Sequence, residues 1–142
     1  MRKYILPLSF AALAAASSSA LAVTTSDNFQ TRINILTSCA VTANDVDFGN
    51  VGVIAGGESA SGSVSVNCSA GTAYTLSFDA AGTIFNYAGN MTDGTSNVAY
   101  SAALSGAGGV GPGNFTVNAV LPAQVTPAPG IYTDNRTVYV NY

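Results

Sequence analysis

The chain has 142 residues, a length typical of one domain, and a formal net charge of −3. Only 8% of its residues are charged, against about 25% in ordinary globular proteins, and it contains no histidine. Binding to nucleic acid or to an anionic membrane surface needs clustered lysine and arginine, so this composition argues against both. The absence of histidine excludes a Ser-His-Asp triad, a Cys-His pair and a histidine zinc site.

The first 22 residues have the pattern of an export signal. Arg2 and Lys3 precede an apolar run over 4–15, and Ala20 and Ala22 form an A-x-A cleavage site. Serines interrupt the run too early for a membrane anchor, which needs about 20 apolar residues. We expect cleavage after Ala22, which leaves 120 residues with no segment for membrane insertion. This mature chain has two arginines, no lysine and seven acids, a net charge of −5.

Two cysteines, Cys39 and Cys68, remain in the mature chain. In an oxidising compartment a single pair is most simply a disulfide. The bridge would contribute about 3.6 kcal/mol by restricting the unfolded chain. The alternative is a redox-active pair, but the sequence has neither Cys-x-x-Cys spacing nor a basic neighbourhood that would lower a thiol pKa.

The mature chain shows alternating, strand-like segments between turn signals and no amphipathic helix. Turns every 8–12 residues predict an all-β fold, an antiparallel sandwich or barrel. Four stretches are expected to be irregular: loops at 52–57 and 106–113, a turn at 90–96 and a proline-rich connection at 122–130. The expected strands are 23–35, 35–41, 46–48, 62–68, 73–79, 83–85, 97–104, 115–121 and 132–142.

Candidate catalytic groups are few. Asp45 and Asp47 are two residues apart and would share one face of a strand, which could suit calcium, but a polar turn explains them more simply. A glycosidase would need two carboxylates flanking a bond, and no such pair stands out. Exposed tyrosines could stack on sugars, although tyrosines in strands more often pack. The sequence therefore predicts no enzyme, no cofactor and no metal site.

Both ends of the mature chain have the pattern of strands. Residues 23–33 alternate, with Val23, Phe29 and Ile33 on one face. Burying that face stabilises less than fixing the backbone costs, so the segment needs hydrogen-bond ladders inside a sheet. It either completes its own domain or inserts into another copy by strand addition. Because donor and acceptor surfaces differ, insertion would be head-to-tail and would generate an open filament.

Several segments resemble the spore coat U domain family. In the first half these are 32–41, 46–49 and 63–68, which include both cysteines. The C-terminal segments 126–134 and 138–142 are similar to the closing motif of that family. The same domain forms the subunits of archaic, Csu-type chaperone–usher pili.

The resemblance implies an incomplete immunoglobulin-like β-sandwich over 34–142, completed by a donor strand from another chain. It places the donor at 23–33, with Thr25, Phe29, Thr31 and Ile33 on the inserting face. It places the acceptor groove at the first and last strands of the sandwich, including Val138 and Val140, and the chaperone contact at Tyr142. Its implied partners are a periplasmic chaperone, an outer-membrane usher and other pilus subunits. The implied route runs through the periplasm to the cell surface.

Two residues depart from the pattern of the family. Arg136 stands where the closing motif usually has an apolar residue, so the start of the last strand is expected to face solvent. Asp27 lies on the inserting face of the donor, where small or apolar residues are expected. The register of the donor therefore stays open at the level of sequence.

Other functions remain as alternatives to a pilus subunit. A self-completed surface or coat protein of the same fold would not polymerise and would be a stable monomer. A tip adhesin usually carries an additional binding domain, for which 120 residues leave no room.

Overall fold

The computed structural model describes residues 23–142 and divides the chain after Ile33. The expected export signal at 1–22 lies outside the described residues. Residues 23–33 contain no strand, and Val23, Phe29 and Ile33 are more than 80% exposed. The expected strand over 23–35 is therefore not formed in the single chain.

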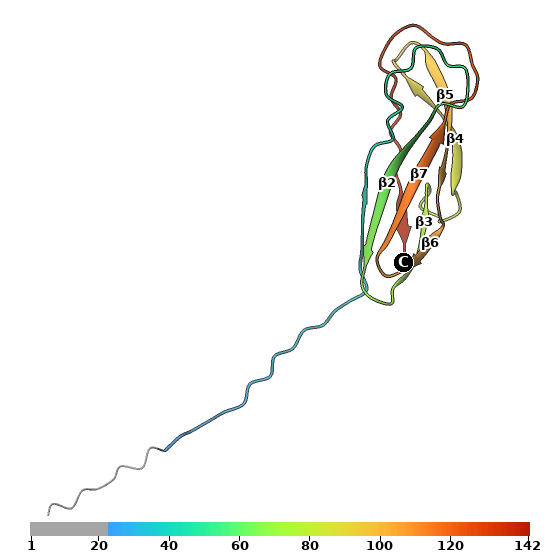
Figure 1. Ribbon diagram of the computed structural model, residues 1–142. Helices are drawn as coiled ribbons and strands as arrows, with labels where there is room; N and C mark the ends of the chain where they lie inside the picture. Colours follow the sequence, from blue (N-terminus) through green and yellow to red (C-terminus); the bar gives the residue numbers. More distant parts are fainter. Residues whose placement is uncertain (1–22) are drawn as a thin grey trace, which may run out of the picture. The chain divides into compact units, whose positions relative to one another are not determined.

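The unit Asn34–Tyr142 is built from eight strands (Figure 1). The described residues contain no helix, and thus none long and apolar enough to cross a membrane. The strands are β1 (Cys39–Ala43), β2 (Ser59–Cys68), β3 (Ala73–Ser77), β4 (Asn86–Thr92), β5 (Asn97–Leu104), β6 (Gly108–Val110), β7 (Gly113–Val120) and β8 (Tyr139–Asn141).

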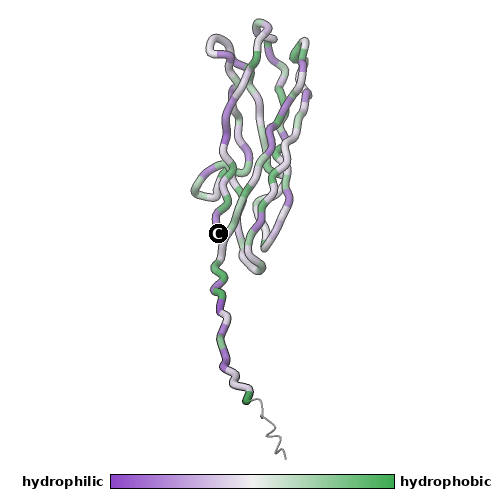
Figure 2. The backbone as a smooth tube through the Cα atoms, turned by 90° about the vertical axis from the view of Figure 1, so that its left-hand side faces the viewer, coloured by the Kyte–Doolittle hydropathy of each residue, from purple (hydrophilic) through white to green (hydrophobic). Residues whose placement is uncertain are grey.

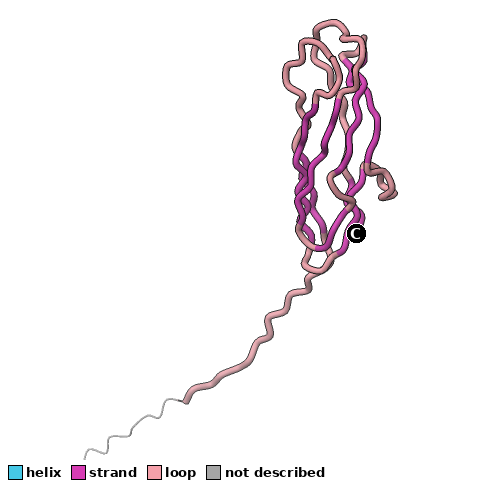
Figure 3. The backbone as a smooth tube through the Cα atoms, turned by 45° about the vertical axis from the view of Figure 1, so that its right-hand side comes forward, coloured by secondary structure: helices cyan, strands magenta, loops and turns pink. Residues whose placement is uncertain are grey.

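These strands form two antiparallel sheets. The larger has the order β1-β2-β7-β5-β4 and the smaller has the order β6-β3-β8. Long loops join the strands, notably between β1 and β2 and between β7 and β8 (Figure 3). The fold is an all-β, immunoglobulin-like sandwich, as the sequence predicts.

Alternation along the strands fills the core. On β2, Val64, Val66 and Cys68 are buried, while Ser65 and Asn67 between them face solvent. Leu76 of β3 is completely buried in the opposite sheet. Figure 2 shows hydrophilic and hydrophobic positions interleaved along the strands. One buried face and one solvated face is the pattern expected of antiparallel sheets.

Two expected strands are loops, and aspartates explain both. At 46–48, the carboxylate of Asp47 accepts a hydrogen bond from the Gly49 amide at 2.7 Å, which closes a turn. At 83–85, the carboxylate of Asp79 accepts hydrogen bonds from the amides of Thr83 and Ile84, at 2.8 and 2.7 Å. Aspartate hydrogen bonds therefore stabilise both segments, and at 84 and 85 the backbone carbonyls also accept hydrogen bonds from the amides of Phe78 and Leu104.

Other strand boundaries also differ from expectation. β1 begins at Cys39 rather than at 35, and only Tyr139–Asn141 of the expected last strand is assigned as strand. β4 was missed because its small and polar residues lack a β-branched pattern. β6 lies inside the expected glycine loop at 106–113, where a Cβ on Gly108 would collide with the backbone of Tyr74.

We predict that Leu76→Ala lowers the free energy of unfolding by about 3–5 kcal/mol, because it leaves a cavity in a fully buried site. Val120→Ala is the matched control, since Val120 is 41% exposed and should lose less than about 1 kcal/mol. Urea unfolding measures both. Equal losses would contradict this assignment of the core.

Candidate functional site

Two edge strands, one from each sheet, lie beside each other. β1 pairs only with β2, and β8 pairs only with β3. β1 and β8 are in contact, but no ladder joins them among the described residues. Each strand therefore has one row of backbone N–H and C=O groups without a ladder partner, which makes it a template for a further strand. We call the space between them the β1/β8 seam.

The inner face of β1 is unusually open. Cys39, Val41 and Ala43 stand opposite Cys68, Val66 and Val64 of β2, all three of which are buried. Residues directly opposite in an antiparallel pair point to the same side of the sheet. Val41 therefore points to the interior, yet it is 39% exposed. The interior of the sandwich is not closed over β1.

The inner face of β8 supplies the other wall of the seam. Val140 stands opposite the fully buried Leu76, so it points inward. Val138 and Val140 are half-buried against the core, and Tyr142 is exposed. The structure thus brings the predicted groove residues Val138 and Val140 to the seam. Val41 was not singled out from sequence, although its strand was expected to line the groove.

A cleft of about 650 Å³ lies between the segment that follows β1 and the segment that leads to β8. Its walls are Val46–Gly52 and Thr126–Tyr132, and Phe48, Met91 and Leu121 give it an apolar lining. The Ile54 amide donates a hydrogen bond to the Thr126 hydroxyl at 2.9 Å, which ties the two loops together. We call this space the loop cleft.

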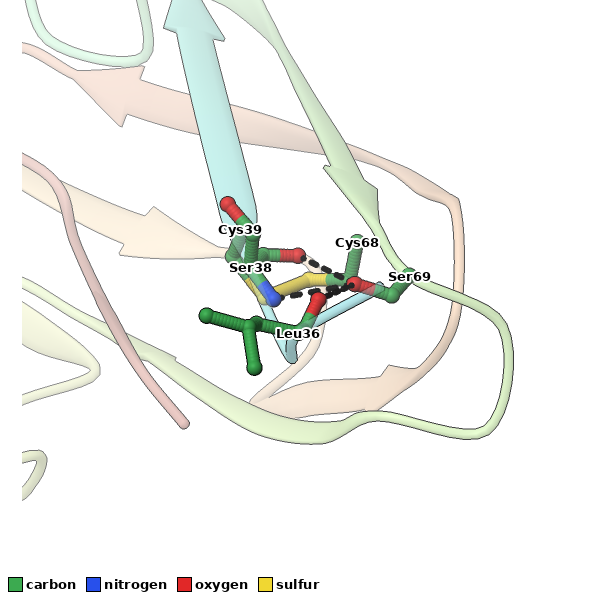
Figure 4. The surroundings of a disulfide bond; sticks show 5 residues. All are labelled: Leu36, Ser38, Cys39, Cys68 and Ser69. Atoms are coloured by element: carbon green, nitrogen blue, oxygen red, sulfur yellow. Dashed lines mark hydrogen bonds between the residues drawn. A yellow bond between two sulfur atoms is a disulfide. The ribbon is translucent and has the colours of Figure 1, made fainter. Parts of the chain in front are cut away.

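The disulfide Cys39–Cys68 fixes the beginning of β1 (Figure 4). Hydrogen bonds of Ser69 also stabilise the backbone just before β1. Its hydroxyl accepts a hydrogen bond from the Ser38 amide at 2.9 Å and lies 3.2 Å from the carbonyl oxygens of Leu36 and Ser38. The edge strand is therefore held in place by a covalent bond as well as by its single ladder.

A polar chain runs across the interior from β4 to the segment before β8. The hydroxyls of Tyr87 and Tyr100 are 2.8 Å apart, and Tyr100 donates to Asp134 Oδ2 at 2.7 Å. Arg136 Nε donates to the same oxygen at 2.9 Å, and its guanidinium lies 5.0 Å from the centre of the Tyr87 ring. Burial, followed by the hydrogen bonds to Tyr87 and Asp134, raises the pKa of the Tyr100 hydroxyl. Sequence reasoning noticed Arg136 but not its partners.

The remaining acids hold loops. Glu58 accepts hydrogen bonds from the amides of Ala55 and Gly56, and its own amide and that of Ala55 lower the pKa of its carboxyl. In the β4–β5 turn, Asp93 accepts hydrogen bonds from the amides of Ser96 and Thr95, which lower the pKa of its carboxyl. Within residues 23–142 no three acidic or cysteine side chains gather as metal ligands would. These acids therefore stabilise turns, and the candidate site is the β1/β8 seam together with the loop cleft.

The fold and the seam define an all-β, immunoglobulin-like sandwich in which β1 and β8 each have a free edge. The chain belongs to the Spore Coat Protein U domain family, which matches residues 25–102. This family comprises structural surface proteins of coat or pilus type rather than enzymes. The match begins within the segment 23–33 and ends in β5. No curated protein and no solved structure matches the chain.

We predict that reducing the Cys39–Cys68 bridge lowers the free energy of unfolding by about 3.6 kcal/mol, because the unfolded chain regains the freedom of a loop of about 30 residues. Urea unfolding with and without reductant measures the loss. A double Cys→Ala variant that resists urea as well as the oxidised protein would contradict the prediction.

We predict that Tyr100→Phe lowers the free energy of unfolding by about 1–3 kcal/mol, because the mostly buried carboxylate of Asp134 loses a hydrogen-bond donor. Tyr132→Phe removes an exposed hydrogen bond, to the Ala128 carbonyl, and is the control with little expected loss. Thermal unfolding compares the two variants. Indistinguishable midpoints would show that the polar chain adds no stability.

Proposed function

We propose that this protein is a structural subunit of a surface pilus, assembled by the chaperone–usher route through donor-strand exchange. The observation that carries the proposal is Val41, an inward-facing side chain left exposed at the edge of its sheet. An extra strand in the β1/β8 seam would cover Val41 and the half-buried Val138 and Val140. It would also supply hydrogen-bond partners for the free edge of β8.

The segment 23–33 has the properties of such a strand. Val23, Phe29 and Ile33 alternate along it and are 86%, 91% and 81% exposed in the single chain. Eleven extended residues span about 37 Å, close to the length of about 34 Å expected for the ten residues of β2. The donor is therefore long enough to run along the whole sandwich.

The direction of the inserted donor strand follows from the sheet that would receive it. All pairs in the sheet β6-β3-β8 are antiparallel. Antiparallel pairing is slightly more stable per residue than parallel pairing, so a strand added to β8 is expected to run opposite to it. Each subunit then gives its own segment 23–33 to one neighbour and receives that of another. This head-to-tail contact continues as a filament.

The proposal assigns the partners as follows. Before assembly, a strand of a periplasmic chaperone occupies the seam, and the chaperone contacts the chain at Tyr142. An outer-membrane usher then exchanges the chaperone strand for the donor strand of another subunit. Membership of the family and the free edge of β8 support this route. The filament would stand at the cell surface.

The test is co-expression with a periplasmic chaperone of the archaic class, followed by electrophoresis of unheated samples in SDS. We expect a ladder of SDS-resistant oligomers that disappears when residues 23–33 are deleted. Phe29→Asp should also abolish the ladder, because it places a charge on the inserting face. Gln30→Asp, on the opposite face, is the matched control and should preserve it. A stable monomer with a filled seam in the unaltered protein would instead indicate a self-completed surface protein.

A further inference from the structure

The segment 23–33 carries one charged side chain on its apolar face. Asp27 shares the parity of Val23, Phe29 and Ile33, whereas Arg32 has the opposite parity. In the single chain Asp27 is exposed, and one of its carboxylate oxygens accepts a hydrogen bond from the neighbouring Asn28 amide. A carboxylate that enters a sandwich without a partner is strongly unfavourable. Insertion of this face therefore calls for a cation in the receiving seam.

The unit Asn34–Tyr142 has one basic side chain, Arg136. Arg136 shares the parity of Val138 and Val140, whose side chains line the β1/β8 seam. Its side chain is 49% exposed, and its partner Asp134 bonds only to Nε. Within residues 23–142 Asp134 is its one carboxylate partner, and the Tyr100 hydroxyl lies close to the guanidinium, so no second carboxylate is paired with its two terminal amino groups. A second carboxylate can approach them in the bidentate geometry that guanidinium favours.

Arg136 is also held in position for such a partner. Asp134 fixes Nε, and Tyr100 fixes Asp134 through the same oxygen. The guanidinium rests on the ring of Tyr87. A cation whose conformation is already fixed loses little entropy when it binds a carboxylate.

We propose that Asp27 of one copy forms an ion pair with Arg136 of the next copy, and that this pair sets the register of the inserted strand. The inference rests on the proposed function, since it needs donor-strand exchange between copies. In an antiparallel strand with this pair fixed, Thr25 lies at the level of Val138 and Val23 at the level of Val140. Ile33 reaches the level of Gly130, at the apolar loop cleft. The register therefore matches apolar donor residues with apolar surroundings at both ends.

A charge exchange in the full-length chain tests the pair. The variants are Asp27→Arg, Arg136→Asp and the double variant, each co-expressed with the chaperone. The measured quantity is the rate at which SDS-resistant oligomers dissociate at a fixed elevated temperature. Each single variant should dissociate at least about tenfold faster than the unaltered protein, because like charges meet in the seam. The double variant should return to within about threefold of the original rate, as coupled residues do in a double-mutant cycle.

Asn28→Arg is the control, because it also introduces an arginine, but on the opposite face, and should leave the dissociation rate unchanged. If the Arg136→Asp variant does not accumulate, two variants of the donor segment test the ion pair instead. Asp27→Asn should make the oligomers dissociate faster, whereas Asn28→Asp should not. If Asp27 and Asn28 variants behave alike while the ladder persists, the pair is overturned and the pilus function stands. If the unaltered protein forms no ladder, both proposals fail.

Discussion

The structure depends on a hydrogen-bond ladder that is missing between β1 and β8. Both strands have a partner on one side only, and they belong to different sheets. The result is a sandwich whose inner face is reachable at Val41 on one side and at Val138 and Val140 on the other. An unpaired edge with apolar side chains behind it favours a further strand. The disulfide and Ser69 hold the beginning of β1 at this edge of the sheet.

Charge is distributed in a way that supports this account. None of the eight strands contains an aspartate, glutamate, lysine or arginine. The acids of the sandwich unit lie in loops, where several of them hold backbone amides. Against this background the ion pair of Asp134 and Arg136, in the segment before β8, stands out, as does Asp27 on the apolar face of 23–33. Charges placed at an interface select the partner and the register more than they add raw affinity.

Much of the fold could be predicted from the sequence because the signals were local. Period-two alternation located β2, β3, β5 and β7, and the single pair of cysteines in a chain expected to be exported predicted the bridge that joins β1 to β2. The missed elements lacked such signals. β4 is composed of small and polar residues, and β6 is a glycine-rich strand that exists because β3 pairs with it.

The candidate site shows the same division between local and tertiary information. The family motif in the last strand predicts Val138 and Val140 as groove residues, and the structure places both half-buried against the core. The open environment of Val41 depends on where the second sheet ends, which no local pattern encodes. Tyr100 lies 34 residues before Asp134, and Tyr87 precedes Tyr100 in the chain, so only the fold brings these rings to Asp134 and Arg136.

Amide hydrogen exchange in the isolated chain and in the oligomer tests the central claim most directly. The account predicts fast exchange for segment 23–33 and for the β8 amides that face the seam in the isolated chain. Both should become strongly protected together when oligomers form, while β2 and β7 are protected in both states. Protection of 23–33 already in the monomer, or an unprotected β8 in the oligomer, would contradict the account.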